Sequence, residues 1–302
     1  MTSTIALPLR VGARTVGRIS RRLVRVTVSL EEALLGQPPQ LPPLAGNAHG
    51  YLITAMPAAA QVELERRRPK LKALVRQRYG RSYASLQGSY DGYLAQFSSK
   101  SRSTLKRKVR KATELSGGRL DLRSYSRPDD VELFHGLARQ VSAKTYQERL
   151  LGAGLPDGDE MLAEMRSLAS RGAFRGWLLF LDGKAISYLY APAEGATLVY
   201  AYLGYDPDFA DLSPGTVLQF EVMRELMEEK RFAYFDFTGG EGQHKKQFET
   251  GSVECVDLLL LRTTLGNMAV GKLLNGFDSG VALAKRGIHA LGLQRLARRL
   301  RR

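Results

Sequence analysis

The segment FDFTGGEGQHKKQF gathers residues that could carry proton transfer. Glu241, His244 and Lys245 stand at positions i, i+3 and i+4, which places them on one face of a short helix. A carboxylate or an imidazole could accept a proton near neutral pH, and an ammonium group could stabilise a developing anion. The alternative is a solvated turn whose Glu–Lys pair contributes little. Because their side chains could carry out these steps, Glu241, His244 and Lys245 are the catalytic candidates.

The segment YLGYDPDFADLSPGTVL suits a different task, the binding of a phosphate group. It predicts a strand that ends at Gly204, a polar loop, and a helix with Ser213 as N-cap and Pro214 in its first turn. Gly215 places no side chain between a ligand and the amides that follow it, including that of Thr216. Free amides and the helix dipole favour a pyrophosphate. Plain capping of a helix that binds nothing is the alternative.

A third polar cluster lies in the segment SAKTYQERL near a predicted helix end. These side chains could line a cleft for the substrate, or they could simply solvate the helix. The substrate-binding candidates are Lys144, Tyr146, Gln147 and Arg149. Cys255 stands among apolar residues of a predicted strand, where a structural thiol is favoured over a nucleophile. The histidines are scattered without ligand spacing, so no metal site is predicted.

These candidates need elements to position them, and the second half of the chain shows a regular order of elements. Periodicity and turn residues predict the order β-α-α-β-β-β-α-β-α-β, with a hairpin turn at Asp182–Gly183 and one strand in EGATLVYAYLGYD. Upstream, residues 58–78 favour helix, kinked or divided at Pro69. Hairpins combined with a helical crossover predict the α+β (mixed-sheet α/β) class. The predicted domains are an N-terminal α/β lobe at 1–90, a second domain at 91–265 and a basic helical tail at 266–302.

Composition limits the compartment and the partners. The 302 residues include one cysteine, so a reducing, cytoplasmic location is expected. Apolar runs stay far below the roughly 20 residues of a membrane-spanning helix. The net charge is +15, and residues 100–111 and 285–302 carry seven Lys or Arg each without an acid. This pattern indicates an anionic partner, such as a phosphorylated cofactor, RNA or an anionic membrane surface, with two solvated basic helices as the alternative.

The joint order of these motifs resembles a known family. LSPGTVLQFEVMRELMEEKRFAYFDFTGGEGQHKKQF is similar to the C-terminal signature of the GNAT-related acyltransferases of the BioF2-like, or CelD/BcsL cellulose-biosynthesis, group. YLAQFSSKSRSTLKRKVRK resembles the entry segment of that group, which is related to the Fem aminoacyl transferases. The resemblance covers about residues 90–250. His244 stands where the group usually has Tyr, Gln247 where Arg is common, and Gly239 where a basic residue is frequent.

The resemblance implies a GNAT-like fold for residues 91–265 and, by analogy with Fem-type proteins, a degenerate first GNAT lobe for residues 1–90. It implies an N-acyltransferase, most simply an acetyltransferase, that uses acetyl-CoA or another acyl-CoA and a small-molecule amine acceptor. A role in polysaccharide or cell-envelope metabolism would follow from the same group.

The resemblance also assigns roles to residues. The thioester carbonyl and pantetheine would lie along a strand, and the pyrophosphate would cap the helix after it. The residues implied to bind this cofactor are Tyr202, Leu203, Gly204, Ser213, Pro214, Gly215 and Thr216. Glu241 or His244 would act as the general base, and Lys245 would contact the carbonyl or a phosphate.

Two other functions stay open. A Fem-like transferase would use charged tRNA, and both the basic segment 100–111 and the basic tail would suit such a polyanion. A non-catalytic adaptor at a membrane polysaccharide machine would instead place Leu293, Leu296 and Leu300 of the tail 285–302 on anionic lipid.

Overall fold

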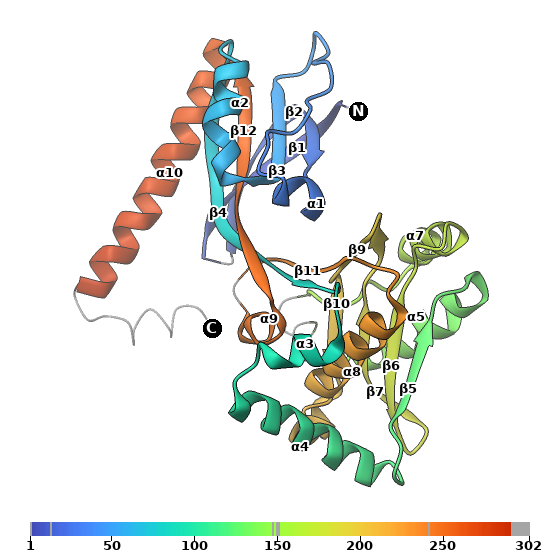
Figure 1. Ribbon diagram of the computed structural model, residues 1–302. Coiled ribbons are helices and arrows are strands. Elements are labelled where there is room, and N and C mark those ends of the chain that lie inside the picture. The colour runs from blue at the N-terminus through green and yellow to red at the C-terminus, as the bar shows by residue number, and fades with distance from the viewer. Residues whose placement is uncertain (1, 13, 147, 149–151, 241, 291–302) are drawn as a thin grey trace. The chain divides into compact units, whose positions relative to one another are not determined.

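The chain folds into two compact units (Figure 1). One unit combines residues 1–79 with residues 254–302, and the other holds residues 80–253. The domain boundaries predicted after residues 90 and 265 stay predictions. The computed structural model describes residues 2–12, 14–146, 148, 152–240 and 242–290.

The first unit is a sheet with one long helix packed on it. Its strand order is β1-β2-β3-β12-β4, with β1 and β2 antiparallel and β2 and β3 parallel. Apolar side chains of the strands form a core with Val270 and Leu274 of the last helix. The elements are β1 (Thr2–Val11), β2 (Arg14–Thr27), α1 (Leu30–Leu34), β3 (Gly50–Pro57), η1 (Ala58–Ala60), α2 (Gln61–Arg67), β4 (Leu71–Ser85), β12 (Gly251–Arg262) and α10 (Leu265–Ala290).

The helix predicted for residues 58–78 is wrong in its second half. Helix α2 ends at Arg67, and the long strand β4 begins at Leu71, just after Pro69. Local propensity favours helix here, but β4 lies beside β12 in the sheet and buries Leu74 in the core. Tertiary pairing therefore overrides the local preference. Both β4 and β12 continue into the second unit.

The second unit carries the candidate residues. Its elements are α3 (Tyr90–Ala95), α4 (Ser99–Leu115), β5 (Asp121–Tyr125), η2 (Pro128–Asp130), α5 (Val131–Ser142), α7 (Asp159–Ser170), β6 (Gly176–Leu181), β7 (Lys184–Tyr190), β8 (Ala193–Glu194), β9 (Thr197–Val199), β10 (Tyr202–Tyr205), η3 (Pro207–Leu212), α8 (Pro214–Glu229), β11 (Tyr234–Gly239) and α9 (Gln243–Phe248). The predicted hairpin is confirmed, because Asp182 and Gly183 both have positive φ between β6 and β7.

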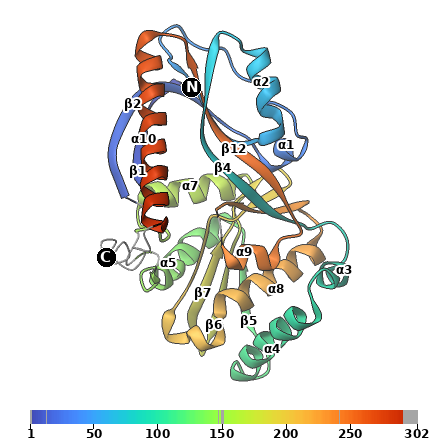
Figure 2. The same cartoon turned by 90° about the vertical axis from the view of Figure 1, so that its left-hand side faces the viewer.

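A four-stranded antiparallel sheet, β10-β7-β6-β5, forms the centre of this unit. Side chains alternate between its two faces, as a strand requires. Trp177 and Leu179 of β6 pack in the same core as α8, whereas Leu178 and Phe180 pack with α5. Figure 2 shows α5 and α8 on opposite sides of β6 and β7. The predicted mixed-sheet α/β class is confirmed.

The single strand predicted in EGATLVYAYLGYD is divided between two sheets. Strand β9 runs parallel to β11, whereas β10 pairs antiparallel with β7. The division falls between two adjacent residues: the Tyr200 N–H donates to Asp236 O of β11 at 2.9 Å, and the Ala201 N–H donates to Tyr190 O of β7 at 3.1 Å. Sequence periodicity carries no information about this change of partner. As a result, β10 leaves β11 and becomes the edge strand of its own sheet.

Candidate functional site

A cavity of about 250 Å³ lies against β10, α8 and α9 in the second unit. Four of the residues predicted to bind a cofactor line it together: Leu203, Ser213, Gly215 and Thr216. A larger pocket of about 720 Å³ lies in the same unit, but none of the candidate residues line it. We therefore take the smaller cavity as the candidate site, because the residues selected by their chemistry converge there.

Helix α8 begins at this cavity in an unusual conformation. Ser213 is its N-cap residue and Pro214 its first helical residue, as predicted, but Ser213 adopts φ 51° and its side chain makes no capping hydrogen bond. Its carbonyl accepts instead from the N–H of Thr216 at 2.9 Å. A left-handed conformation is costly for a residue other than glycine. The Ser213 hydroxyl is therefore left at the cavity without a capping role.

Glycine at position 215 is explained by close packing. A Cβ atom there would lie 3.0 Å from Cδ2 of Leu203, so any other residue would require the Leu203 side chain to shift. The same turn presents backbone without a side chain to the cavity. This arrangement is compatible with an anion at a helix N-terminus.

The three remaining cofactor candidates do not line the cavity: Pro214 is buried at the start of α8, and Tyr202 and Gly204 belong to β10. The Tyr202 ring stacks on Tyr190 at an interplanar angle of 14°, in the core shared with α5. A Cβ on Gly204 would lie 2.5 Å from the Tyr188 ring, and its carbonyl accepts from Ser187 Oγ at 2.8 Å. Their side-chain positions therefore serve packing, and only the backbone edge of β10 faces away from β7.

Lys245 of α9 is the catalytic candidate whose side chain the structure describes. It is half-buried, and its Nζ donates to Gly239 O at 3.0 Å and lies 3.4 Å from Thr238 Oγ1. The ammonium also lies 5.8 Å from the centre of the Tyr200 ring, which lines the cavity. Burial lowers the pKa of Lys245 below its ordinary value, against the opposing influence of the Asp236 charge.

A buried ion pair fixes the turn that carries this lysine. Arg81 of β4 donates to Asp236 Oδ2 of β11 from two nitrogens, at 3.0 and 2.6 Å, and Asp236 is fully buried. The other carboxylate oxygen of Asp236 accepts from the Thr238 N–H at 2.7 Å. Thr238 and Gly240 both have positive φ, so the chain turns sharply towards α9. The pair thereby orients the backbone that contacts Lys245.

The other catalytic candidates fall outside the described part of the structure. Glu241 is not among the described residues, and the side chain of His244 within α9 is not described either. The same holds for Gln147 and Arg149 among the substrate candidates, and for the tail 291–302. Their predicted roles, including the membrane contact of residues 285–302, stay predictions.

The described substrate candidates, Lys144 and Tyr146, do not line the cavity. Tyr146 is exposed, whereas Lys144 donates to the buried carboxylate of Asp206 at 2.7 Å, and Lys184 donates to the same oxygen at 3.1 Å. Burial would raise the pKa of Asp206, but the hydrogen bonds from the two lysines outweigh it and lower the pKa. Asp206 caps the 3₁₀ helix that leads to Ser213. Lys144 is thus linked by its ion pair with Asp206 to the segment that leads into α8 at the cavity.

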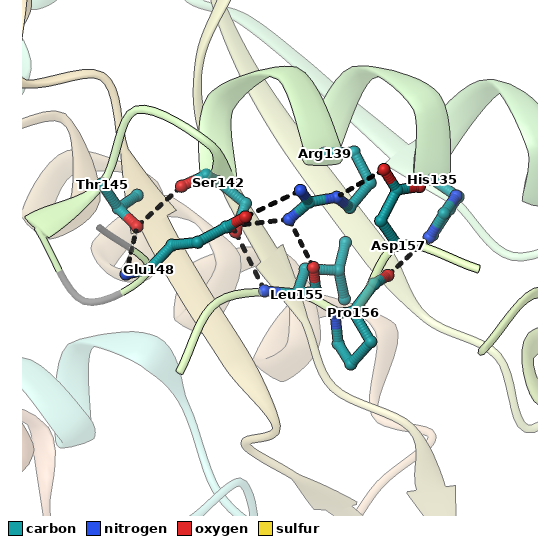
Figure 3. A network of polar contacts seen from close by, with 8 residues as sticks. All are labelled: His135, Arg139, Ser142, Thr145, Glu148, Leu155, Pro156 and Asp157. Carbon is teal, nitrogen blue, oxygen red and sulfur yellow. Dashed lines mark hydrogen bonds and ion pairs between the residues drawn. The ribbon is translucent and has the colours of Figure 1, made fainter. Parts of the chain in front are cut away.

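A network of polar contacts holds the segment that bears Lys144 (Figure 3). Arg139 of α5 binds both carboxylate oxygens of Glu148, at 2.6 and 2.7 Å. Ser142 Oγ donates to the same carboxylate at 2.6 Å and accepts from the Leu155 N–H at 2.9 Å. The hydrogen bonds from Arg139, and then from Ser142, lower the pKa of Glu148 although burial opposes them. Charge-assisted, bidentate pairs of this kind fix the orientation of the two side chains relative to each other.

Sequence reasoning missed Gln219 and Tyr200 as cavity residues. Tyr200 could not be found, because its position depends on the break between β9 and β10. Gln219 did leave a signal: it is a polar residue four positions after Gly215 within the apolar run of α8. By contrast, Val217, Phe220 and Met223 of the same helix are buried in the core, and Cys255 is buried in β12.

Comparison with known proteins agrees with this geometry. Residues 99–246 match the sequence model of the acetyltransferase (GNAT) domain. The fold is similar to that of FemX, with a TM-score of 0.55 at 13% identity over 86% of this chain and 88% of that chain. It is also similar to the C-terminal domain of an Agrobacterium fabrum protein described as a lysylphosphatidylglycerol synthetase, with a TM-score of 0.52 at 11% identity over 76% and 72%. A conserved protein of unknown function from Bacteroides thetaiotaomicron VPI-5482 gives a TM-score of 0.52 at 13% identity over 70% of each chain.

These findings define the class of the domain. No curated protein sequence matches the chain, and the structural identities are low, so the similarity to FemX and the synthetase concerns the fold. Residues 99–246 are similar to a GNAT acetyltransferase domain, which supports acyl transfer as the general chemistry, and the likeness to FemX shows a similar fold. The described helices include none long and apolar enough to cross a membrane. Within the described part of the chain, no group of His, Cys, Asp and Glu could hold a metal ion.

Proposed function

We propose that this protein is an acyl-CoA-dependent N-acyltransferase whose donor binds in the 250 Å³ cavity between β10 and α8. The observation that carries the proposal is the convergence of three features there: an edge strand, the first turn of a helix, and the half-buried Lys245 above Tyr200. Acetyl-CoA is the first donor to test. From the order of the sequence motifs, we also propose that the protein belongs to the BioF2-like, CelD-type group. A role in polysaccharide or cell-envelope metabolism is part of the same proposal.

The donor would lie along β10 with its pyrophosphate at α8. The backbone of Tyr202, Leu203 and Gly204 forms a sheet edge, and amide groups of a pantetheine arm can hydrogen-bond to such an edge as a strand would. Ser213, Pro214, Gly215 and Thr216 would receive the phosphates, where the helix dipole and the unengaged Ser213 hydroxyl favour negative charge.

The reaction would proceed by direct attack of the acceptor amine on the thioester carbonyl. A C–N bond forms, the C–S bond breaks, and the CoA thiolate leaves. The amine proton passes to a base, for which Glu241 and His244 are the candidates. Lys245 would stabilise the oxyanion of the tetrahedral intermediate, because a half-buried ammonium acts more strongly there than in water.

The acceptor would enter beside the segment that carries Lys144 and Tyr146. Lys144 is tied to Asp206 on the loop before α8, so an acceptor that contacts this lysine would lie near the donor. Gln147 and Arg149 would complete the same surface. A small amine, such as an amino sugar, is the proposed acceptor class.

Calorimetric titration with acetyl-CoA tests the proposal. We expect binding in the micromolar-to-millimolar range for the full chain and its loss in Gly215→Val, because a side chain there runs into Leu203 and the cavity. Gly136→Val is the matched control, since a Cβ at Gly136 meets nothing within 4 Å. Absence of binding to the folded wild type at millimolar acetyl-CoA would show that the proposal is wrong.

An aminoacyl-tRNA donor is the second candidate function. It is favoured by helix α4, on which Lys100, Lys106, Arg107, Arg110 and Lys111 are all exposed, and by the likeness to FemX. Ionic strength separates the two donors. Binding of tRNA should weaken steeply between 50 and 200 mM salt, by about 10³-fold if six or more phosphates are contacted, whereas CoA binding should change little.

A further inference from the structure

Gln219 is a buried polar side chain at the candidate site that lacks hydrogen bonds. It lies in the second turn of α8, is 2% exposed and lines the cavity. Neither Nε2 nor Oε1 has a hydrogen-bond partner in the described part of the protein. A buried amide in this state costs stability, because both its donor and its acceptor were hydrated in the unfolded chain.

The position of Gln219 places it near the reactive end of the donor. It is four residues beyond Gly215, or about 6 Å along the helix axis, and so away from the turn proposed for the phosphates. Tyr200 lines the same cavity, and the Lys245 ammonium lies over the Tyr200 ring. Leu203 and Phe248 supply the apolar remainder of the wall. The unsatisfied amide therefore shares the cavity with Tyr200, over whose ring lies the lysine proposed to contact the thioester carbonyl.

We infer that Gln219 selects a transferred acyl group that bears a hydroxyl near the thioester, in preference to a hydrocarbon acyl group of the same length. A hydroxyl offers one donor and an acceptor, which matches the unused acceptor and donor of the carboxamide. A hydrocarbon chain offers neither group and leaves both atoms unsatisfied. The inference rests on the proposed function and narrows its donor from acyl-CoA in general to hydroxyacyl-CoA.

Binding of two matched donors tests this selection without knowledge of the acceptor. The full chain is titrated with 3-hydroxybutyryl-CoA and with butyryl-CoA, which have the same chain length. We expect the hydroxylated donor to bind about tenfold more tightly, the ratio that one satisfied buried hydrogen bond provides. In Gln219→Met, which keeps the length of the side chain but not its polar atoms, the ratio should fall to one or invert.

Thermal unfolding without ligand supplies a second, independent readout. Removing an unsatisfied amide should raise the Tm of Gln219→Met by about 2 °C or more, whereas removal of a structural glutamine would lower it. Tyr190→Phe is the matched control. The Tyr190 hydroxyl is also buried without a hydrogen-bond partner among the described residues, but Tyr190 does not line this cavity. That variant should also gain stability, yet it should keep the preference between the two donors.

The outcomes separate the inference from the function beneath it. Equal binding of both donors by the wild type, or a lowered Tm for Gln219→Met, overturns the inference and leaves acyl-CoA binding intact. A Gln219→Met variant that binds free CoA more weakly would show that the glutamine contacts the donor arm, and this also overturns it. If the folded wild type binds no acyl-CoA at all, the proposed function and the inference fail together.

Discussion

Two polar clusters in the second unit differ in how completely their hydrogen bonds are satisfied. Around Glu148, both carboxylate oxygens are bound by Arg139, and Ser142 bridges to the backbone of Leu155 (Figure 3). Among the described residues of this cluster, Arg139 Nε lacks a hydrogen bond, but it lies 3.8 Å from a carboxylate oxygen of Asp157. At the cavity, the donor and the acceptor of the Gln219 amide both lack a hydrogen-bond partner among the described residues, and Ser213 makes no capping bond. The first cluster therefore builds structure, whereas the second retains hydrogen-bonding capacity for a ligand.

The comparison explains why stability and function should respond to different residues. A satisfied buried network destabilises the fold when one member is removed, because the others are left without partners. An unsatisfied group at a cavity already costs stability, so its removal should be neutral or favourable for folding while it impairs binding. Substitutions in the two clusters can therefore test this difference from both sides.

The largest expected effect concerns Lys245. Lys245→Met should lower kcat by about 10²-fold, since removal of one preorganised oxyanion donor costs this much in other acyl transfers. Donor affinity should change little if the lysine acts mainly on the transition state. Release of free CoA thiol from acetyl-CoA with a panel of amines measures turnover. The activity of the wild type should also fall as pH rises through the lowered pKa of Lys245, because the ammonium is lost there.

Lys246→Met is the control for this substitution, because Lys246 follows on the same helix and is exposed. Equal losses in the two variants would mean that charge on α9, rather than the ammonium at Tyr200, supports turnover.

A smaller effect, on stability, is expected in the satisfied network. Glu148→Gln should lower the free energy of unfolding by about 2 kcal/mol at pH 7, within the range for hydrogen bonds to charged groups. Because the folded pKa of Glu148 is lowered, its contribution is full above the ordinary glutamate pKa of about 4.3 and is lost as pH falls through the folded pKa. The difference between wild type and variant should therefore shrink in acid. Urea denaturation at pH 7, 5 and 3 measures it.

Glu132→Gln is the comparison variant, because the Glu132–Arg166 pair is about half exposed on both sides. Its cost should stay below about 1 kcal/mol. A Glu148→Gln penalty that is no larger, or that is independent of pH, would contradict the structural role given to the network.

Sequence reasoning recovered most elements of the second unit because their signals are local. The Asp182–Gly183 turn and the Pro214 start of α8 depend on neighbours within a few residues. The strand at 71–78 and the break at Tyr200 depend instead on partners far along the chain, β12 and β11. Local pattern could not supply them.

The candidate site shows the same limit. Residues Ser213–Thr216 could be selected because capping chemistry is readable from a few neighbouring residues, and the structure places three of them at the cavity. Gln219 left a signal as a polar residue in an apolar run, but its importance could not be read from that signal, because it depends on surroundings that leave the amide unsatisfied. Hydrogen-bond satisfaction is a property of the folded structure and not of spacing.

The smallest expected effect concerns Ser213 at the start of α8. At this one residue we expect a substitution to raise stability and to weaken ligand binding. Ser213 has φ 51°, which glycine adopts without strain, and its hydroxyl does not cap the helix. Ser213→Gly should therefore raise the free energy of unfolding by about 0.5 kcal/mol while it weakens acetyl-CoA binding several-fold.

Lys230→Gly is the matched control, because Lys230 has φ 56° at the other end of the same helix and does not line the cavity. It should gain similar stability and leave donor affinity unchanged. If both variants bind acetyl-CoA as the wild type does, the Ser213 hydroxyl takes no part in holding the donor. The left-handed conformation of Ser213 would then serve only to direct the chain into α8.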